Sequence, residues 1–119
     1  MQAEIITIGD ELLIGQVVDT NSAWLGQMLN KNNIRIKRIN SISDDANEIK
    51  TVLSDCLNRS ELIIITGGLG PTKDDITKHT LCDYFEDTLV RNTEVENHVI
   101  DLIERALGRV ASQINKDQA

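Results

Sequence analysis

The fold of this chain is decided by the stretch Leu62-Ile63-Ile64-Ile65-Thr66-Gly67-Gly68-Leu69-Gly70-Pro71-Thr72-Lys73-Asp74-Asp75-Ile76-Thr77. Its apolar, β-branched start predicts a strand buried on both faces of a parallel sheet. Gly67, Gly68 and Gly70 then let the chain turn sharply, because glycine can adopt positive φ. They also let a ligand lie against backbone N–H groups, which bind anions. The stretch therefore predicts a strand followed by a phosphate-binding loop.

A helix is expected directly after this loop. Pro71 fixes its own φ, and Thr72 can cap a helix whose third residue is Asp75, in a Thr-x-x-Asp capping box. Asp74 and Asp75 would repel a phosphorylated ligand unless a divalent cation lay between them, since Mg²⁺ prefers carboxylate and phosphate oxygens. We therefore expect a metal at Asp74 and Asp75. Taken alone, each aspartate is also explained as a helix-start residue that contributes roughly 0.3–1 kcal/mol.

Two common nucleotide-binding motifs are absent from the chain. Lys73 stands where the dinucleotide fingerprint needs its third glycine, and no G-x-x-x-x-G-K-[ST] sequence occurs. The Rossmann and P-loop interpretations are therefore both excluded.

Composition predicts one soluble domain that does not bind nucleic acid. A chain of 119 residues is long enough for one core and too short for two. The net charge of −7 argues against a nucleic-acid partner. The start of the chain lacks a leader pattern, and no apolar run approaches ~18 residues, so we expect a cytoplasmic location and no membrane partner. Cys56 and Cys82 have no C-x-x-C spacing and are expected to be buried in a reducing compartment.

Acidic residues follow two further predicted strands. The strand at 5–9 ends in Gly9-Asp10-Glu11, and the half-exposed strand at 34–39 is followed by Ser43-Asp44-Asp45. If the strands are neighbours, Asp10 or Glu11 lies beside the glycine loop. An acidic, solvated turn is the alternative interpretation. Asp45 caps a helix together with Glu48, which leaves Asp44 unengaged.

Four helices are expected between and after the strands. The first has caps at 19–22 and an apolar face that places Trp24 in the core. Asp19 and Asn21 are capping residues there, with ligand contact as a second interpretation. Later helices follow Asp45, run from Asp75 to about Phe85, and open with the Thr93-x-x-Glu96 capping box. That last helix directs Val95, Val99, Leu102, Ile103 and Ala106 inward and ends at Gly108, and residues 110–119 are a frayed extension.

The alternation of strands and helices predicts a three-layer α/β/α fold with a mostly parallel sheet and right-handed crossovers. We expect a single domain over residues 1–119. Three strands make a small sheet for such a fold, so the sheet is expected to be incomplete at its carboxyl end.

Three motifs resemble the amino-terminal domain of the CinA family of competence/damage-inducible proteins, within the wider MoaB/MogA-like molybdopterin-binding fold. They are Thr7-Ile8-Gly9-Asp10-Glu11-Leu12, Gly15-Gln16-Val17-Val18-Asp19-Thr20-Asn21, and Thr66 to Asp75. Asn115-Lys116-Asp117-Gln118-Ala119 is similar to an Asn-x-x-Gln-Ala stretch inside the family's domain, where further strands follow. By this resemblance the chain is a truncated form of the domain.

The resemblance implies hydrolysis of ADP-ribose to AMP and ribose 5-phosphate with a divalent metal, Mg²⁺ or Co²⁺, and a homo-oligomer. By position it implies that Asp75 and Asp44 are catalytic and that Asp74 and Asp75 hold the metal. The residues expected to bind the phosphorylated small-molecule substrate are Gly9, Asp10, Glu11, Asn21, Gly67, Gly68, Gly70 and Thr72. Molybdopterin binding or adenylylation is one alternative, and a non-catalytic nucleotide-binding regulatory domain is another.

Overall fold

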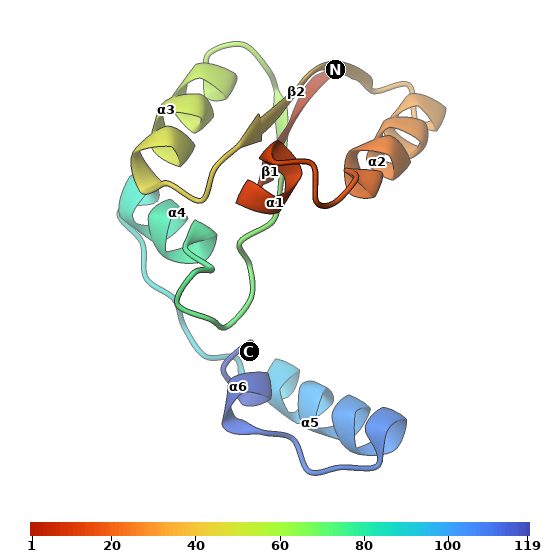
Figure 1. The fold of residues 1–119 in the computed structure, drawn as a ribbon, viewed down its shortest axis with the longest axis vertical. Helices are drawn as coiled ribbons and strands as arrows, with labels where there is room; N and C mark the ends of the chain where they lie inside the picture. The colour runs from red at the N-terminus through yellow and green to blue at the C-terminus, as the bar shows by residue number, and fades with distance from the viewer.

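The computed structural model describes all 119 residues, which form three strands and six helices (Figure 1). In chain order these are β1 (Gln2–Ile8), α1 (Asp10–Leu13), α2 (Thr20–Lys31), β2 (Arg35–Ile42), α3 (Ala46–Leu57), β3 (Leu62–Thr66), α4 (Thr77–Phe85), α5 (Thr93–Leu107) and α6 (Gln113–Lys116). None of the helices is both long enough and apolar enough to cross a membrane.

The sheet is parallel throughout, with strand order β2-β1-β3. Strand β1 is the central strand, and its residues from Ala3 to Ile8 are all buried. Its carboxyl end is aligned with both neighbours, through the pairs Ile8 with Ile42 and Thr7 with Thr66. The predicted parallel α/β fold is confirmed, and the first strand is a neighbour of the third.

Helices lie on both sides of the sheet, with α3 and α4 on one side and α2 on the other (Figure 1). The main core lies between the sheet and helix α3. It is made of Ile6, Ile8, Ile42, Ile49, Leu53 and Cys56. Each fully buried isoleucine contributes about 1.5–3 kcal/mol relative to an exposed one. The predicted burial of Cys56 is confirmed, whereas Cys82 is only partly buried.

Two predictions about buried residues are wrong. Strand β3 is an edge strand of intermediate exposure along its whole length, because it has a neighbour on one side only. An apolar, β-branched run does not distinguish a central strand from an edge strand. Trp24 was expected in the core but is 60% exposed. Helix α2 packs mainly on β2, and no further layer covers the side that carries Trp24.

The last two helices stand apart from the sheet (Figure 1). Helix α5 has no fully buried residue, so the predicted inward direction is wrong for Val95, Leu102 and Ala106, which are exposed, while Val99 and Ile103 are partly buried. Residues 110–119 are not a frayed extension, since they include α6, whose start has a complete Ser112–Asn115 capping box. An ion pair of 2.8 Å between Arg91 and Asp117 and a hydrogen bond of 2.9 Å from the Asn92 N–H to the Ala119 carbonyl join α6 to the segment before α5.

Candidate functional site

The carboxyl ends of the three strands bring the predicted acidic and glycine segments to one edge of the sheet. Because β1 is central, Gly9 and the residues after it lie between the end of β2 and the glycine loop after β3. The Gly9 N–H donates to the Ile42 carbonyl at 3.0 Å, and the Asp10 N–H donates to Asp44 Oδ2 at 3.3 Å. Asp10 and Glu11 belong to the short helix α1 and not to a turn. The condition under which these acids were expected beside the glycine loop is met, since β1 is a neighbour of β3.

The first two glycines of the loop are required by the fold itself. Gly67 has φ +95°, and a Cβ there would lie 1.9 Å from the Ile8 carbonyl oxygen. Gly68 has φ +60°, and a Cβ there would lie 2.3 Å from Thr77 Oγ1 and 3.3 Å from Asp44 Oδ1. No side chain larger than hydrogen fits between these neighbours. Both glycines thus allow the ends of β1, β2 and β3 to approach one another.

Gly70 differs from the other two because its φ is not positive. A Cβ at Gly70 would lie 2.6 Å from Asp75 Oδ2, so the Asp75 carboxylate lies directly against its backbone. Glu11 has the same relation to Gly9, where a Cβ would lie 2.5 Å from Glu11 Oε1. In each case a protein carboxylate lies against the glycine backbone, at the kind of position expected for a ligand anion.

Asp75 is held by Thr72. Both the N–H of Thr72, at 3.1 Å, and its hydroxyl donate to Asp75 Oδ2. These hydrogen bonds lower the pKa of Asp75, with smaller effects from the Gly70 backbone and the Lys78 charge. Helix α4 starts only at Thr77, and its N-cap residue Ile76 makes no side-chain cap. The predicted helix start with Asp75 as third residue is therefore wrong, since Thr72 and Asp75 close a turn within the loop.

Asp44 has the opposite electrostatic environment. Loss of hydration is the main reason that its pKa is raised, and the negative charges of Asp10, Glu11 and Asp75 add to the effect. Its hydrogen bond from the Asp10 N–H acts in the other direction. The prediction that Asp45 is the capping residue is confirmed, since Asp45 accepts from the Glu48 N–H at 2.9 Å. Asp44 is thereby left to face the neighbouring strand end.

Thr77 is a residue of this site whose role was not predicted from the sequence. It is fully buried, its Oγ1 donates to the Gly67 carbonyl at 3.0 Å, and its N–H donates to the Gly68 carbonyl at 3.1 Å. Thr77 therefore fixes the glycine loop to the first turn of α4. The sequence does contain a signal for this role, because Thr77 comes soon after the Asp74-Asp75 pair. At that position a polar side chain can reach back to free carbonyl groups of the loop.

Other predicted site residues are not brought to the loop by any contact. Asp74 is exposed, and its side chain makes no hydrogen bond or ion pair. Asn21 is exposed in the first turn of α2. Asp19 is the N-cap of α2 and accepts from the Ser22 N–H at 2.9 Å, which confirms its capping role. No group of three or more His, Cys, Asp or Glu side chains is arranged to hold a metal.

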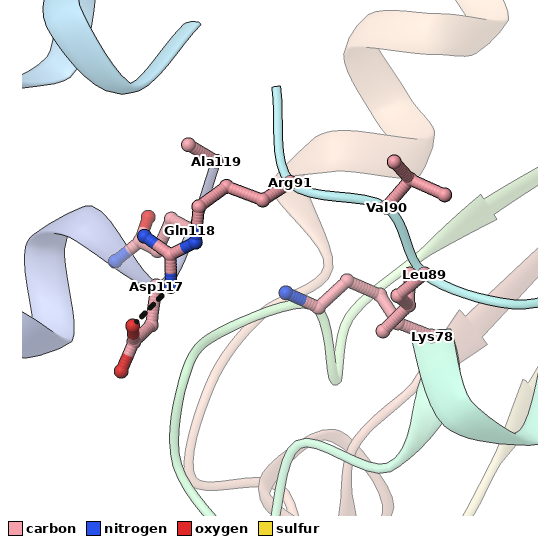
Figure 2. A pocket seen from close by; sticks show the side chains of 7 residues that line it. All are labelled: Lys78, Leu89, Val90, Arg91, Asp117, Gln118 and Ala119. Carbon is pink, nitrogen blue, oxygen red and sulfur yellow. Dashed lines mark hydrogen bonds and ion pairs between the residues drawn. The ribbon is translucent and has the colours of Figure 1, made fainter. Parts of the chain in front are cut away.

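A pocket of about 330 Å³ lies between α4, the segment before α5 and the end of the chain (Figure 2). It is lined in part by Lys78, Leu89, Val90, Arg91 and Asp117, and the Arg91–Asp117 ion pair crosses one wall. None of the predicted site residues lines it. Lys78 follows Thr77 in α4 and forms no ion pair, so its ammonium group is the unpaired charge in this pocket.

Comparison with known proteins gives one matching family. The sequence model of one protein family, described as a probable molybdopterin binding domain, matches residues 4–116 of this chain. The CinA-like protein of Flavobacterium psychrophilum is 52% identical over 119 residues, which are the whole of this chain and 28% of that protein. The putative competence-damage inducible protein of Caldicellulosiruptor saccharolyticus is 43% identical over 122 residues, covering the whole chain and 29% of that protein. The chain thus spans less than a third of the length of these relatives.

Solved structures share the fold. The CinA protein of Thermoplasma acidophilum matches with a TM-score of 0.76 and 28% identity, over 98% of this chain and 67% of that one. The molybdopterin biosynthesis enzyme MoaB from Thermus thermophilus matches with a TM-score of 0.65 and 20% identity, over 96% and 68% of the two chains.

Proposed function

We propose, from the premise that this chain belongs to the family of molybdopterin-binding domains as a CinA-like amino-terminal domain, that its sheet edge binds and hydrolyses a nucleotide pyrophosphate. The substrate class is ADP-ribose or a similar nucleotide sugar, and the products are AMP and a sugar phosphate. One observation carries the proposal, namely the meeting of Asp44, Asp75 and the glycine loop at the carboxyl edge of a parallel sheet. Ligands of open α/β folds bind at this edge.

The two aspartates differ in a way that suits two roles. Asp75 has a lowered pKa because Thr72 donates to it, so it stays ionised at neutral pH. Asp44 has a raised pKa because it is poorly hydrated and surrounded by other carboxylates. Carboxylates whose pKa values are moved apart commonly divide into a base and a charged ligand or stabiliser. We assign the base to Asp44 and the ionised, ligand-facing carboxylate to Asp75.

In the proposed reaction a water molecule attacks one phosphorus of the pyrophosphate. Asp44 accepts the proton of that water, a new P–O bond forms, and the bond from the same phosphorus to the bridging oxygen breaks. Loop N–H groups other than that of Gly70, which bonds to Asp75, hold the phosphate oxygens on which negative charge grows. The bridging oxygen leaves with the second phosphate.

The donor groups at this edge suit a divalent cation only in part. Four carboxylates, those of Asp10, Glu11, Asp44 and Asp75, gather there, and their mutual repulsion contributes to the raised pKa of Asp44. They do not form a site with three or more protein ligands. Phosphate oxygens and water would therefore have to supply the rest of the coordination, as they commonly do for Mg²⁺. Asp75, with Asp74 beside it, would hold the ion, which would neutralise charge on the phosphates.

Molybdopterin binding is the second candidate function. It is supported by the family to which the chain belongs and by the fold shared with MoaB from Thermus thermophilus. A pterin carrying a phosphate would use the same glycine loop. The two candidates differ in their products, because binding of a pterin releases no AMP.

The test is AMP release from ADP-ribose with Mg²⁺ or Co²⁺. We expect activity in the unaltered chain and a loss of roughly 10²–10⁴-fold in Asp44→Asn and in Asp75→Asn, as is typical when an acid–base group is removed. In the unaltered chain the rate should rise with pH as Asp44 loses its proton, and Asp44→Asn should lack this limb. Asp55→Asn is the control, because Asp55 is an exposed aspartate of α3 away from the site.

Each alternative has its own signature in the same samples. Tight binding of ADP-ribose without AMP would leave a non-catalytic nucleotide-binding domain. If a pterin phosphate displaces bound ADP-ribose at a concentration lower than that of ADP-ribose itself, the molybdopterin alternative is supported. If Asp75→Asn and Asp55→Asn release AMP at equal rates, the reaction does not take place at the glycine loop.

A further inference from the structure

The pocket beside α4 has one cation without a partner, although the chain as a whole is acidic. Lys78 and Arg91 contribute positive charges to its lining and Asp117 a negative one, whereas the net charge of the chain is −7. Arg91 is already neutralised by ion pairs with Glu96 at 3.1 Å and with Asp117 at 2.8 Å. Lys78 is partly buried and forms no ion pair. An anionic group in this pocket would therefore pair with Lys78.

Lys78 also joins this pocket to the glycine loop. It follows Thr77, whose side chain and N–H donate to the Gly67 and Gly68 carbonyls at 3.0 and 3.1 Å. Consecutive Cα atoms are only about 3.8 Å apart, so Lys78 starts directly beside the loop. Its charge is also one of the causes that lower the pKa of Asp75. A ligand that lies on the glycine loop would thus reach the pocket by passing the Lys78 ammonium group.

The other lining residues suit a nucleoside. Leu89 and Val90 are apolar and 56% and 82% exposed. The Arg91 guanidinium group is held by its two ion pairs and donates to the Lys116 carbonyl at 3.4 Å, and a fixed, planar guanidinium group can stack on a base. The Gln118 amide can both donate and accept, as the edge of a base requires. The volume of about 330 Å³ is at the lower end of the range for small-molecule pockets.

We propose that this pocket binds the nucleoside 5′-phosphate half of the substrate, with Lys78 paired to its phosphate. The base would lie among Leu89, Arg91 and Gln118. Figure 2 shows that the Lys78 side chain extends toward the side of the pocket where the Arg91–Asp117 pair lies. The inference rests on the proposed function for the position of the pyrophosphate, which continues from Lys78 onto the glycine loop.

A nucleoside monophosphate satisfies both kinds of group in the lining. A purely apolar occupant would cover Leu89 and Val90 but would leave the Lys78 charge unpaired, which is unfavourable in a partly buried position. Inorganic phosphate would pair with Lys78 but would leave the two apolar side chains uncovered. Only an occupant with an anionic group next to a flat, largely apolar part makes both contacts.

The test is a nuclear magnetic resonance titration of the nitrogen-15 labelled chain with AMP. It is made without divalent metal, so that binding through a metal at Asp75 does not contribute. We expect saturable shifts of the amide signals of residues 78, 89–91 and 118, with a dissociation constant in roughly the millimolar range. Inorganic phosphate and ribose 5-phosphate should bind more weakly than AMP, because neither carries a base.

Two variants separate the phosphate contact from the base contact. Lys78→Gln should weaken AMP binding by roughly 10-fold or more, because a charge-assisted hydrogen bond is lost. Its control is Lys31→Gln, in an exposed lysine at the end of α2. Leu89→Gln should weaken AMP binding but leave binding of inorganic phosphate unchanged. Its control is Leu57→Gln, since Leu57 is a similarly exposed leucine, 47%, at the end of α3.

The outcomes distinguish this inference from the proposed hydrolysis. No AMP binding, AMP shifts confined to residues outside the pocket, or equal affinity for AMP and inorganic phosphate would each overturn the inference. If the chain hydrolyses ADP-ribose and Lys78→Gln leaves KM unchanged, the inference fails while the proposed function stands. If AMP binds in the pocket and Lys78→Gln weakens it, but ADP-ribose is not hydrolysed, the nucleotide subsite stands and the proposed hydrolysis fails.

Discussion

Glu4, a residue of the central strand β1, is completely buried, and its carboxylate accepts five hydrogen bonds. Arg59 donates twice, at 3.2 and 3.0 Å, and Asn40, Cys56 and Ser60 each donate once, at 3.2, 3.2 and 2.9 Å. The Arg59 hydrogen bond is the main reason that the pKa of Glu4 falls to about 2. Burial, followed by the hydrogen bond to Glu4 and the Glu4 charge, raises the pKa of the Cys56 thiol to about 11, so this cysteine is an unreactive thiol at neutral pH. The cluster attaches the segment after α3 to the central strand.

We predict that Glu4→Gln lowers the free energy of unfolding by about 3 kcal/mol at pH 7, because it leaves the Arg59 charge without its partner. The pH dependence follows from the lowered pKa. Ionised Glu4 stabilises the fold above about pH 4.5, and this contribution is lost as pH falls toward about 2. Urea unfolding at several pH values is the measurement, with the exposed Glu61→Gln as control. A gap between Glu4→Gln and the unaltered chain that stays constant from pH 7 to pH 2 would contradict this account.

Among the elements, the glycine loop restricts the allowed residue types most strongly. Gly67 combines positive φ with an approach of 1.9 Å from a Cβ to the Ile8 carbonyl oxygen, whereas Gly15, also at positive φ, has nothing within 4 Å. We predict that Gly67→Ala lowers the unfolding free energy by about 3 kcal/mol or more, since it adds a backbone clash to the strain of positive φ. Gly15→Ala should cost only the strain, about 1–2 kcal/mol. Equal midpoints in urea for the two variants would mean that the strand ends move apart without penalty.

The elements also show which features local sequence encodes. The apolar run of β1, the Asp19 and Asp45 caps and the positive φ of Gly67 and Gly68 follow from side-chain chemistry within a few residues, and they were predicted from the sequence, whereas the positive φ expected for Gly70 was wrong. The exposure of β3, of Trp24 and of Val95 and Leu102 in α5 depends on which layers of the fold are present, and no local sequence pattern indicates that. Thr77 and Glu4 were missed for a related reason, because their partners lie ten or more residues away in the chain. The candidate site was predictable as a meeting of strand ends, while its hydrogen bonds were not.

At the scale of the whole molecule, the chain has a sheet part and a helical part that share few contacts. The α5 and α6 helices pack on each other, and the Arg91–Asp117 ion pair and the Asn92 hydrogen bond join α6 to the segment before α5. That segment connects the helical part to α4 and so to the sheet part. A 15-residue helix is marginally stable in water without tertiary packing. The helical part should therefore open without unfolding of the sheet.

Native-state hydrogen exchange tests this division of the molecule. Amides of β1 should exchange only on global unfolding, because they are buried and bonded to two strands. Amides of α5 should exchange orders of magnitude faster in dilute samples, by local opening. Exchange of α5 at the rate of β1 in dilute samples would show instead that the two parts unfold as one cooperative unit.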